Sequence, residues 1–287
     1  SAYQISLGFA KERLQSRSLS GPKAADKPAD PILVHPDVRR MLLRQKVMIE
    51  GCRALAYFTG LHLDVAHDHE DAEVRQQADD LVQLLTPVVK AFLTDEGFAC
   101  ANEGLQVLGG SGFTEDWGIE QLVRDCRITR IYEGTNGIQA LDLVGRKLAL
   151  GGGRAVRGFF ALVEGWLKAN PEAPHAAAVG KALKQLQQAT LWIASEGMKD
   201  PEQAGAASVP YLRLFALTTL AWLWSRMAQT AQAALQGGSS ETVFYGAKLK
   251  SADFYMARVL TETDSLLAEV LAGKTTLMAF SEEEFAA

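Results

Sequence analysis

The sequence predicts an all-α protein, in which an antiparallel four-helix bundle is followed by a second helical domain. Three observations lead to this prediction. Apolar residues recur at three- and four-residue spacing through most of the chain, the alternation of a half-buried strand is nearly absent, and the connections between helical stretches are short. With 48% hydrophobic and 22% charged residues among 287, the chain is globular and large enough to bury a sizeable core.

The four-helix bundle is expected in residues 1–150. A polar, Pro-rich loop separates the first two helices. The glycines of Gly109–Gly112 should end the third helix, because glycine accepts the left-handed backbone that a helix end needs. A turn around residues 118–124 then leads to the last helix. The first helix is expected to end near residues 20–22, and the other helices are expected at residues 36–63, 72–108 and 138–148.

The second helical domain is expected in residues 151–287. The boundary lies at Gly151–Gly153, beyond which the composition shifts toward Ala, Gln and Leu. Helical stretches are expected at residues 154–169, 174–197, 209–236 and 241–272. Four tryptophans supply bulk to this second core: Trp166, Trp192, Trp222 and Trp224.

Charge and cysteine usage narrow the function classes. The net charge of −5 argues against a basic surface that follows phosphates, so no nucleic-acid partner is expected. The three cysteines, Cys52, Cys100 and Cys126, are odd in number and far apart, which favours a reducing cytoplasm over a disulfide framework. No apolar run of membrane-spanning length and no signal peptide are apparent, so we expect a cytoplasmic protein without a membrane span.

Two polar stretches fail the motifs that they suggest. The first stretch is LGGSGFTEDWG (108–118). It has Glu115 where a dinucleotide-binding fingerprint needs its third glycine, and Phe113 where a nucleophile elbow needs its last glycine. A loop that ends a helix explains the stretch better. HLDVAHDHED (62–71) holds three histidines, but their spacing of five and two does not place ligands on one helical face. No metal site is expected.

Glu133, in RITRIYEGTNGIQ (127–139), is the leading candidate for chemistry. Gly134 lets backbone approach a ligand closely, and Thr135 is a good N-cap for the helix that follows. Among Ile131, Tyr132 and a bound apolar ligand, the pKa of the carboxylate would rise toward the range of a general base. The residues alone leave open the alternative that Glu133 is an acid placed at a helix start by the helix dipole.

Arg13 and Gln15 are polar residues at the end of an otherwise apolar helix. They can be a surface pair, or the arginine can bind a phosphate, because a planar guanidinium donates two parallel hydrogen bonds to phosphate oxygens.

Three segments together resemble a known family. LQVLGGSGFTEDWGIEQLVRDCRITRIYEGTNGIQ (105–139) resembles the C-terminal helical domain of the flavin-dependent acyl-CoA dehydrogenases, and YQISLGFAKERLQSRS (3–18) resembles the helix that begins that domain. LVHPDVRRMLL (33–43) and the helical tail past Gly153 are similar to the subgroup with an extra C-terminal domain, which includes the 3-methylmercaptopropionyl-CoA dehydrogenases.

The resemblance implies roles for the matching residues. Glu133 corresponds to the catalytic base that removes the acyl α-proton while the β-hydride passes to the flavin, and its backbone amide helps to hold the thioester carbonyl. Gly134 lines the substrate pocket. Three sets of residues are implied in FAD binding. Thr135 and Asn136 lie against the cofactor, and Arg13 and Gln15 reach the FAD of a partner subunit. The residues on the adenine side are Gln106, Val107, Leu108, Gly109 and Gly110.

The family also implies partners, and two rival interpretations stay open. We expect an acyl-CoA substrate, FAD, an electron-transfer flavoprotein or similar acceptor, and a homodimer or dimer of dimers. The chain starts without Met and already reads as helix, so we expect it to belong to a longer enzyme, and expect the isolated chain to bind FAD poorly and to be inactive. The first rival is a catalytically diverted homologue that acts as a binding or scaffold protein, for example on DNA. The second treats residues 154–287 as a helical module that docks a partner.

Overall fold

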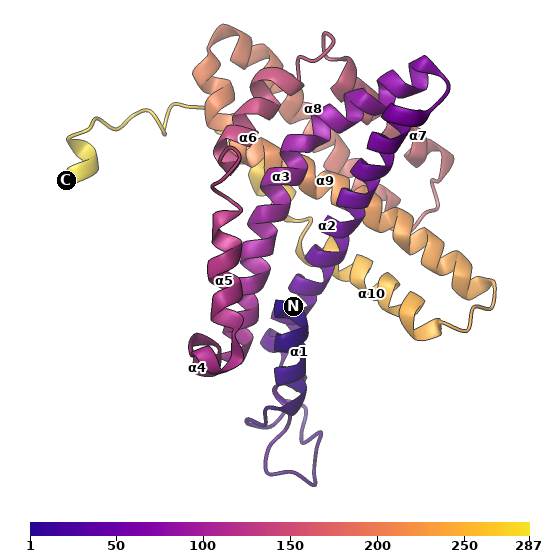
Figure 1. Cartoon of the computed structure of the whole chain (residues 1–287), viewed down its shortest axis with the longest axis vertical. Coiled ribbons are helices and arrows are strands. Elements are labelled where there is room, and N and C mark those ends of the chain that lie inside the picture. The colour runs from indigo at the N-terminus through magenta and orange to yellow at the C-terminus, as the bar shows by residue number, and fades with distance from the viewer. The chain divides into compact units, whose positions relative to one another are not determined.

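The computed structural model describes all 287 residues, Ser1–Ala287, and its regular elements are helical (Figure 1). It has no strand and one isolated antiparallel bridge, between Leu14 and Pro31. The predicted all-α fold class is therefore confirmed.

Most helical elements follow one another with short connections, but a long loop, residues 13–31, separates α1 from η1. In chain order they are α1 (Ala2–Glu12), η1 (Ile32–Val34), α2 (Pro36–Asp68), α3 (Ala72–Leu108), α4 (Gly110–Phe113), η2 (Glu115–Trp117), α5 (Ile119–Ile128), α6 (Asn136–Asp142), η3 (Leu143–Lys147), α7 (Arg154–Ala169), α8 (Ala176–Lys199), α9 (Pro201–Gln236), α10 (Thr242–Arg258), α11 (Glu262–Ala272) and η4 (Glu284–Ala286). Of these, η3 is a π-helical turn and the other η elements are 3₁₀ turns.

The chain forms two compact units. Unit 1 consists of residues 1–50 and 94–133, and unit 2 of residues 51–93 and 134–287. The boundary falls inside α2 and α3.

In unit 1, α2 and α3 run antiparallel. Arg40 pairs with Glu103 at 3.0 Å, and Arg44, one turn later on α2, faces Glu96 at 3.9 Å, further back on α3. Gly104 allows the close approach of α3 to three other helices. A Cβ at Gly104 would lie 3.2 to 3.4 Å from the side chains of Ile119 in α5, Gln45 in α2 and Ala2 in α1.

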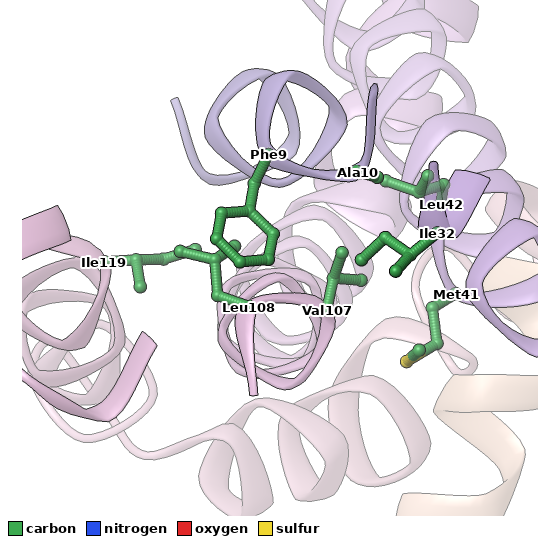
Figure 2. Close-up of a cluster of buried hydrophobic side chains, with 8 residues drawn as sticks. All are labelled: Phe9, Ala10, Ile32, Met41, Leu42, Val107, Leu108 and Ile119. Atoms are coloured by element: carbon green, nitrogen blue, oxygen red, sulfur yellow. The ribbon is translucent and has the colours of Figure 1, made fainter. Parts of the chain in front are cut away.

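A single apolar cluster joins the elements of unit 1 (Figure 2). In Figure 2 the ring of Phe9 is directed from α1 toward the end of α3, where Leu108 lies. The ring of Trp117 lies perpendicular to that of Phe9, with 5.1 Å between centroids. The buried members of the cluster are Phe9, Ala10, Ile32, Met41, Leu42, Val107, Leu108 and Ile119. Five helical segments therefore meet here: α1, η1, the start of α2, the end of α3, and α5.

Two elements of unit 1 differ from the prediction. The first helix ends at Glu12 rather than near residues 20–22, because the backbone beyond it pairs with residues 30–32 instead of continuing the helix. The expected turn at 118–124 is the start of the ten-residue helix α5. Helix α5 therefore belongs to unit 1 together with α1 and parts of α2 and α3, while the expected last helix, 138–148, lies in unit 2 and ends as the π-helical turn η3.

In unit 2 the long helix α9 forms the core. Its buried side chains include Tyr211, Phe215, Trp222 and Trp224. Gly51 of α2 lets this helix come close, since a Cβ there would lie 2.9 Å from both Leu220 and Trp224. By length and composition alone α9 could span a membrane, but 78% of its apolar window is buried inside the protein, as in a core helix.

The helices of the second half follow the predicted stretches with two changes. Helix α9 begins at Pro201 rather than at residue 209, because Asp200 caps it by accepting the N–H of Glu202 at 3.0 Å and proline suits the first helical position. The stretch 241–272 is two helices, α10 and α11, since helix α10 ends at Arg258 and α11 starts at Glu262.

Candidate active site

Glu133 lies in a turn that follows α5. The N–H groups of Ile131 and Tyr132 both donate to the carbonyl of Ile128, at 2.9 and 3.2 Å. Glu133 itself is exposed and has a φ of +54°, and the next residue, Gly134, has a φ of +81°. A left-handed backbone at a residue other than glycine is uncommon and costs free energy, and such strain is concentrated at functional sites.

The segment before Glu133 is anchored to α3 in unit 1. Arg130 donates from Nε to Asp95 Oδ1 at 2.5 Å, and its guanidinium lies over the ring of Phe98, 5.3 Å from the centroid. An ion pair and a cation–π contact on one side chain restrict the end of α5 more than either does alone.

The segment after Glu133 is anchored to α3 in unit 2. Lys90 Nζ donates to the carbonyl oxygen of Gly134 at 2.7 Å and to Asn136 Oδ1 at 2.9 Å. Asn136 returns a hydrogen bond from Nδ2 to the carbonyl of Ala91 at 3.1 Å. Lys90 is not recognisable from the sequence, because a lysine 44 residues away from its partner has no local signal that marks it.

Thr135 is the N-cap of α6, as predicted. Its Oγ1 accepts the N–H of Ile138 at 3.4 Å, and its carbonyl accepts the N–H of Gln139 at 3.0 Å. Gly134 is required next to it, because any side chain would carry the strained φ and its Cβ would lie 3.2 Å from Gln139 Nε2.

Arg13 stands at the end of helix α1, as expected, whereas Gln15 lies beyond the helix. Arg13 caps α1 and its carbonyl accepts the N–H of Ile32 at 2.9 Å; the N–H of Gln15 donates to the carbonyl of Asp30 at 3.0 Å. Both side chains are exposed. The backbone of this segment is thus held while the two polar side chains face solvent.

Asp30 holds the loop that follows. The N–H groups of Ser18, Ala24 and Lys23 and the guanidinium of Arg17 donate to it, and they hold the pKa of this carboxyl at about 2.

Residues 106–110 divide into buried and accessible members. Val107 and Leu108 belong to the unit 1 cluster, at 5% and 3% exposure, so their side chains are not accessible to a ligand. Gln106, Gly109 and Gly110 are exposed, and Gly109 turns the chain with a φ of +60°. Ile32, which binds the Arg13 carbonyl, packs in the same cluster. The structure therefore joins the 13–15 segment and the end of α3 through one core.

Other side chains of the predicted sites are distributed between the units. Glu133 belongs to unit 1 with Arg13, Gln15 and Gln106–Gly110, whereas Gly134, Thr135 and Asn136 belong to unit 2. No group of three or more His, Cys, Asp or Glu side chains is arranged to hold a metal ion. His62 lies against the ring of Phe58, 4.3 Å between centroids, with Nδ1 at 2.8 Å from the Phe58 carbonyl.

The chain matches two sequence models of protein families. The model described as "Acyl-CoA dehydrogenase, C-terminal domain" matches residues 10–148, and the model described as "Acetyl-CoA dehydrogenase C-terminal like" matches residues 159–281.

Similar curated proteins carry related names. The chain is 42% identical over 270 residues to a 3-methylmercaptopropionyl-CoA dehydrogenase of Ruegeria pomeroyi, covering 91% of this chain and 44% of that protein. It is 31% identical over an alignment of 297 positions to a butyryl-CoA dehydrogenase of Syntrophomonas wolfei, which covers 99% of this chain and 47% of that protein. The chain thus spans about half the length of these relatives.

Solved structures share the fold at low identity. ACDH-11 of Caenorhabditis elegans in complex with C11-CoA superposes with a TM-score of 0.71 at 19% identity, over 89% of this chain and 39% of that one. An acyl-CoA dehydrogenase of Bacillus anthracis complexed with FAD superposes with a TM-score of 0.69 at 20% identity, over 94% of this chain and 45% of that one.

Proposed function

Because this chain belongs to the acyl-CoA dehydrogenase family, in the subgroup with an extra C-terminal helical domain, we propose that it is the C-terminal part of an FAD-dependent acyl-CoA dehydrogenase. In this proposal Glu133 is the general base for α,β-dehydrogenation of an acyl-CoA thioester. The supporting observation is the strained, exposed turn at Glu133, which is followed at once by a glycine and an N-cap threonine inside the segment that matches the family.

Each residue of the turn has a part in the reaction. The Glu133 carboxylate takes the proton from the α-carbon, and its backbone amide donates to the thioester carbonyl, where negative charge develops. FAD, when bound, accepts the hydride that leaves the β-carbon. Gly134 lets the substrate approach the backbone, because no side chain occupies that place.

The accessible groups of the chain fit the chemistry of FAD. The exposed guanidinium of Arg13 suits the diphosphate, and the exposed amides of Gln15 and Gln106 suit polar edges of the cofactor. Gly109 and Gly110 expose backbone, and Thr135 and Asn136 complete the set. Val107 and Leu108 contribute through backbone atoms alone, since their side chains are buried.

The assembly and partners are part of the same proposal. Arg13 and Gln15 reach the FAD of a second subunit, which makes the enzyme a homodimer or a dimer of dimers. An electron-transfer flavoprotein or similar acceptor reoxidises the flavin, and the enzyme works in the cytoplasm. The isolated 287-residue chain binds FAD poorly and does not turn over.

We also propose that the chain is built of two modules, 1–150 and 151–287. The two family matches end at residue 148 and begin at residue 159, which supports a join near Gly151–Gly153. The compact units follow another division, in which residues 51–93 go with the second half.

The test uses the full-length protein with Glu133→Gln. Flavin content should stay near that of the wild type, while the rate of flavin reduction by acyl-CoA should fall by about 10³-fold or more, because amide nitrogen cannot take the proton. Near-normal reduction would overturn the assignment. A salt-dependent shift of DNA mobility by the wild type, together with no dehydrogenation, would favour a diverted DNA-binding homologue.

A further inference from the structure

We infer that Lys90 is a positioning residue for the Glu133–Thr135 turn, and that it directs the amide N–H of Thr135 outward as a donor for the bound cofactor. This inference rests on the proposed function for its catalytic consequence. Its geometric part rests on the contacts of Lys90 alone.

The first step is the pair of hydrogen bonds from one ammonium group. Lys90 Nζ lies 2.7 Å from the Gly134 carbonyl oxygen and 2.9 Å from Asn136 Oδ1. Hydrogen bonds from a charged donor are stronger than neutral ones. The lysine therefore holds the residue before Thr135 and the residue after it at once.

The second step is the planarity of the peptide between Gly134 and Thr135. In a trans peptide the C=O and the following N–H point in opposite directions. Because Lys90 draws the Gly134 carbonyl toward α3, the Thr135 N–H points away from α3. This N–H donates to no backbone acceptor in the structure, and Thr135 is exposed. A backbone donor is thus held toward solvent, at a residue that the proposed function places against FAD.

The third step is the stiffness of the support. Lys90 and Ala91 lie in the middle of α3, and Asn136 Nδ2 donates to the Ala91 carbonyl at 3.1 Å. Thr135 is fixed from the other side by its cap to Ile138. Glu133 precedes this supported backbone directly, so a shift of Gly134 would move its carboxylate as well.

The experiment compares Lys90→Met and Lys90→Arg in the full-length protein, with Lys168→Met on the exposed face of α7 as the matched control. The first readout is hydrogen exchange at the amides of Ile138 and Gln139, which report on the Thr135 cap. Lys90→Met should speed their exchange on the order of tenfold, because a charge-assisted hydrogen bond is lost. Lys90→Arg should restore most of the protection, and Lys168→Met should change nothing.

The second readout is flavin reduction by acyl-CoA. A misplaced base slows the chemical step, so kcat should fall roughly 10- to 100-fold in Lys90→Met, with a smaller change in KM and partial recovery in Lys90→Arg. Faster exchange with an unchanged kcat would overturn the positioning role, as would unchanged exchange. If Glu133→Gln kept its activity while Lys90→Met showed the faster exchange, the proposed function would fail and the support of the turn by Lys90 would stand.

Discussion

Arg154 holds Asp80 through two N–H donors, with Nε 2.5 Å from Oδ2 and a terminal nitrogen 2.9 Å from Oδ1. Within unit 2 this pair ties the start of α7 to α3. The Arg154 hydrogen bonds lower the pKa of the Asp80 carboxyl, which is 5% exposed, and Gln76 adds a third hydrogen bond at 3.1 Å. A buried carboxylate depends on such partners, because its desolvation is otherwise uncompensated.

We expect Arg154→Met to destabilise unit 2, since it leaves the Asp80 carboxylate buried without its cation. The midpoint of thermal unfolding should fall by roughly 2–4 °C, the change typical of a modest loss in a chain of this size. Adding Asp80→Asn should recover part of the loss, because the neutral amide is cheaper to bury. Circular dichroism measures the unfolding midpoints. Equal midpoints for Arg154→Met and the wild type would show that the ion pair does not contribute to stability.

Gly112 is expected to tolerate no side chain. A Cβ at this position would lie 2.6 Å from the carbonyl oxygen of Leu105, a backbone atom that cannot move aside. Gly112→Ala should lower the free energy of unfolding by about 1–3 kcal/mol, the usual cost of overpacking. Gly110→Ala is the matched control in the same short helix, since a Cβ there meets nothing within 4 Å. Urea unfolding of both variants measures the difference, and equal losses would contradict the steric explanation.

Asp30 should make unit 1 sensitive to acid. Hydrogen bonds to the Asp30 carboxylate, of which that from the Ser18 N–H has the largest effect, hold the pKa of Asp30 at about 2. This is below the value of about 3.9 for an unfolded chain. Its contribution to stability is therefore complete above about pH 4 and is lost as the pH falls toward about 2. Urea midpoints of the wild type and Asp30→Asn, measured from pH 6 to pH 2, should converge at the acidic end. Parallel curves would show that Asp30 is not the titrating group.

The cysteines should react according to burial. Burial, with Glu96 and Glu103 nearby, raises the pKa of the Cys100 thiol to about 12, and burial and Asp125 also raise the pKa of Cys126, which is only half-buried. Alkylation requires the thiolate. With iodoacetamide at pH 8, Cys126 should react slowly and Cys100 only after unfolding, as peptide mass spectrometry will show. Rapid labelling of Cys100 in the folded protein would mean that its helix opens readily.

The candidate turn was partly predictable. Thr135 as N-cap and Gly109 as the end of α3 follow from local rules on backbone donors and left-handed glycine, and the structure confirms both. The family resemblance singled out Glu133, whose catalytic role stays a prediction. Two contacts hold the turn, one between Arg130 and Asp95 and one between Lys90 and Gly134. Neither could be predicted from the sequence, because each joins residues tens of positions apart.

The sequence by itself determined the all-α class and the long helices, including α3 and α7, because apolar periodicity, caps and glycine stops act within a few neighbouring residues. Only the tertiary structure decided that α1 ends at Glu12, that α5 is a helix, and that α9 is a core helix. Those outcomes depend on backbone pairing with residues 30–32, on packing of Ile119, and on burial by neighbouring helices. Such contacts between distant residues outweigh local preference, and no short window of sequence contains them.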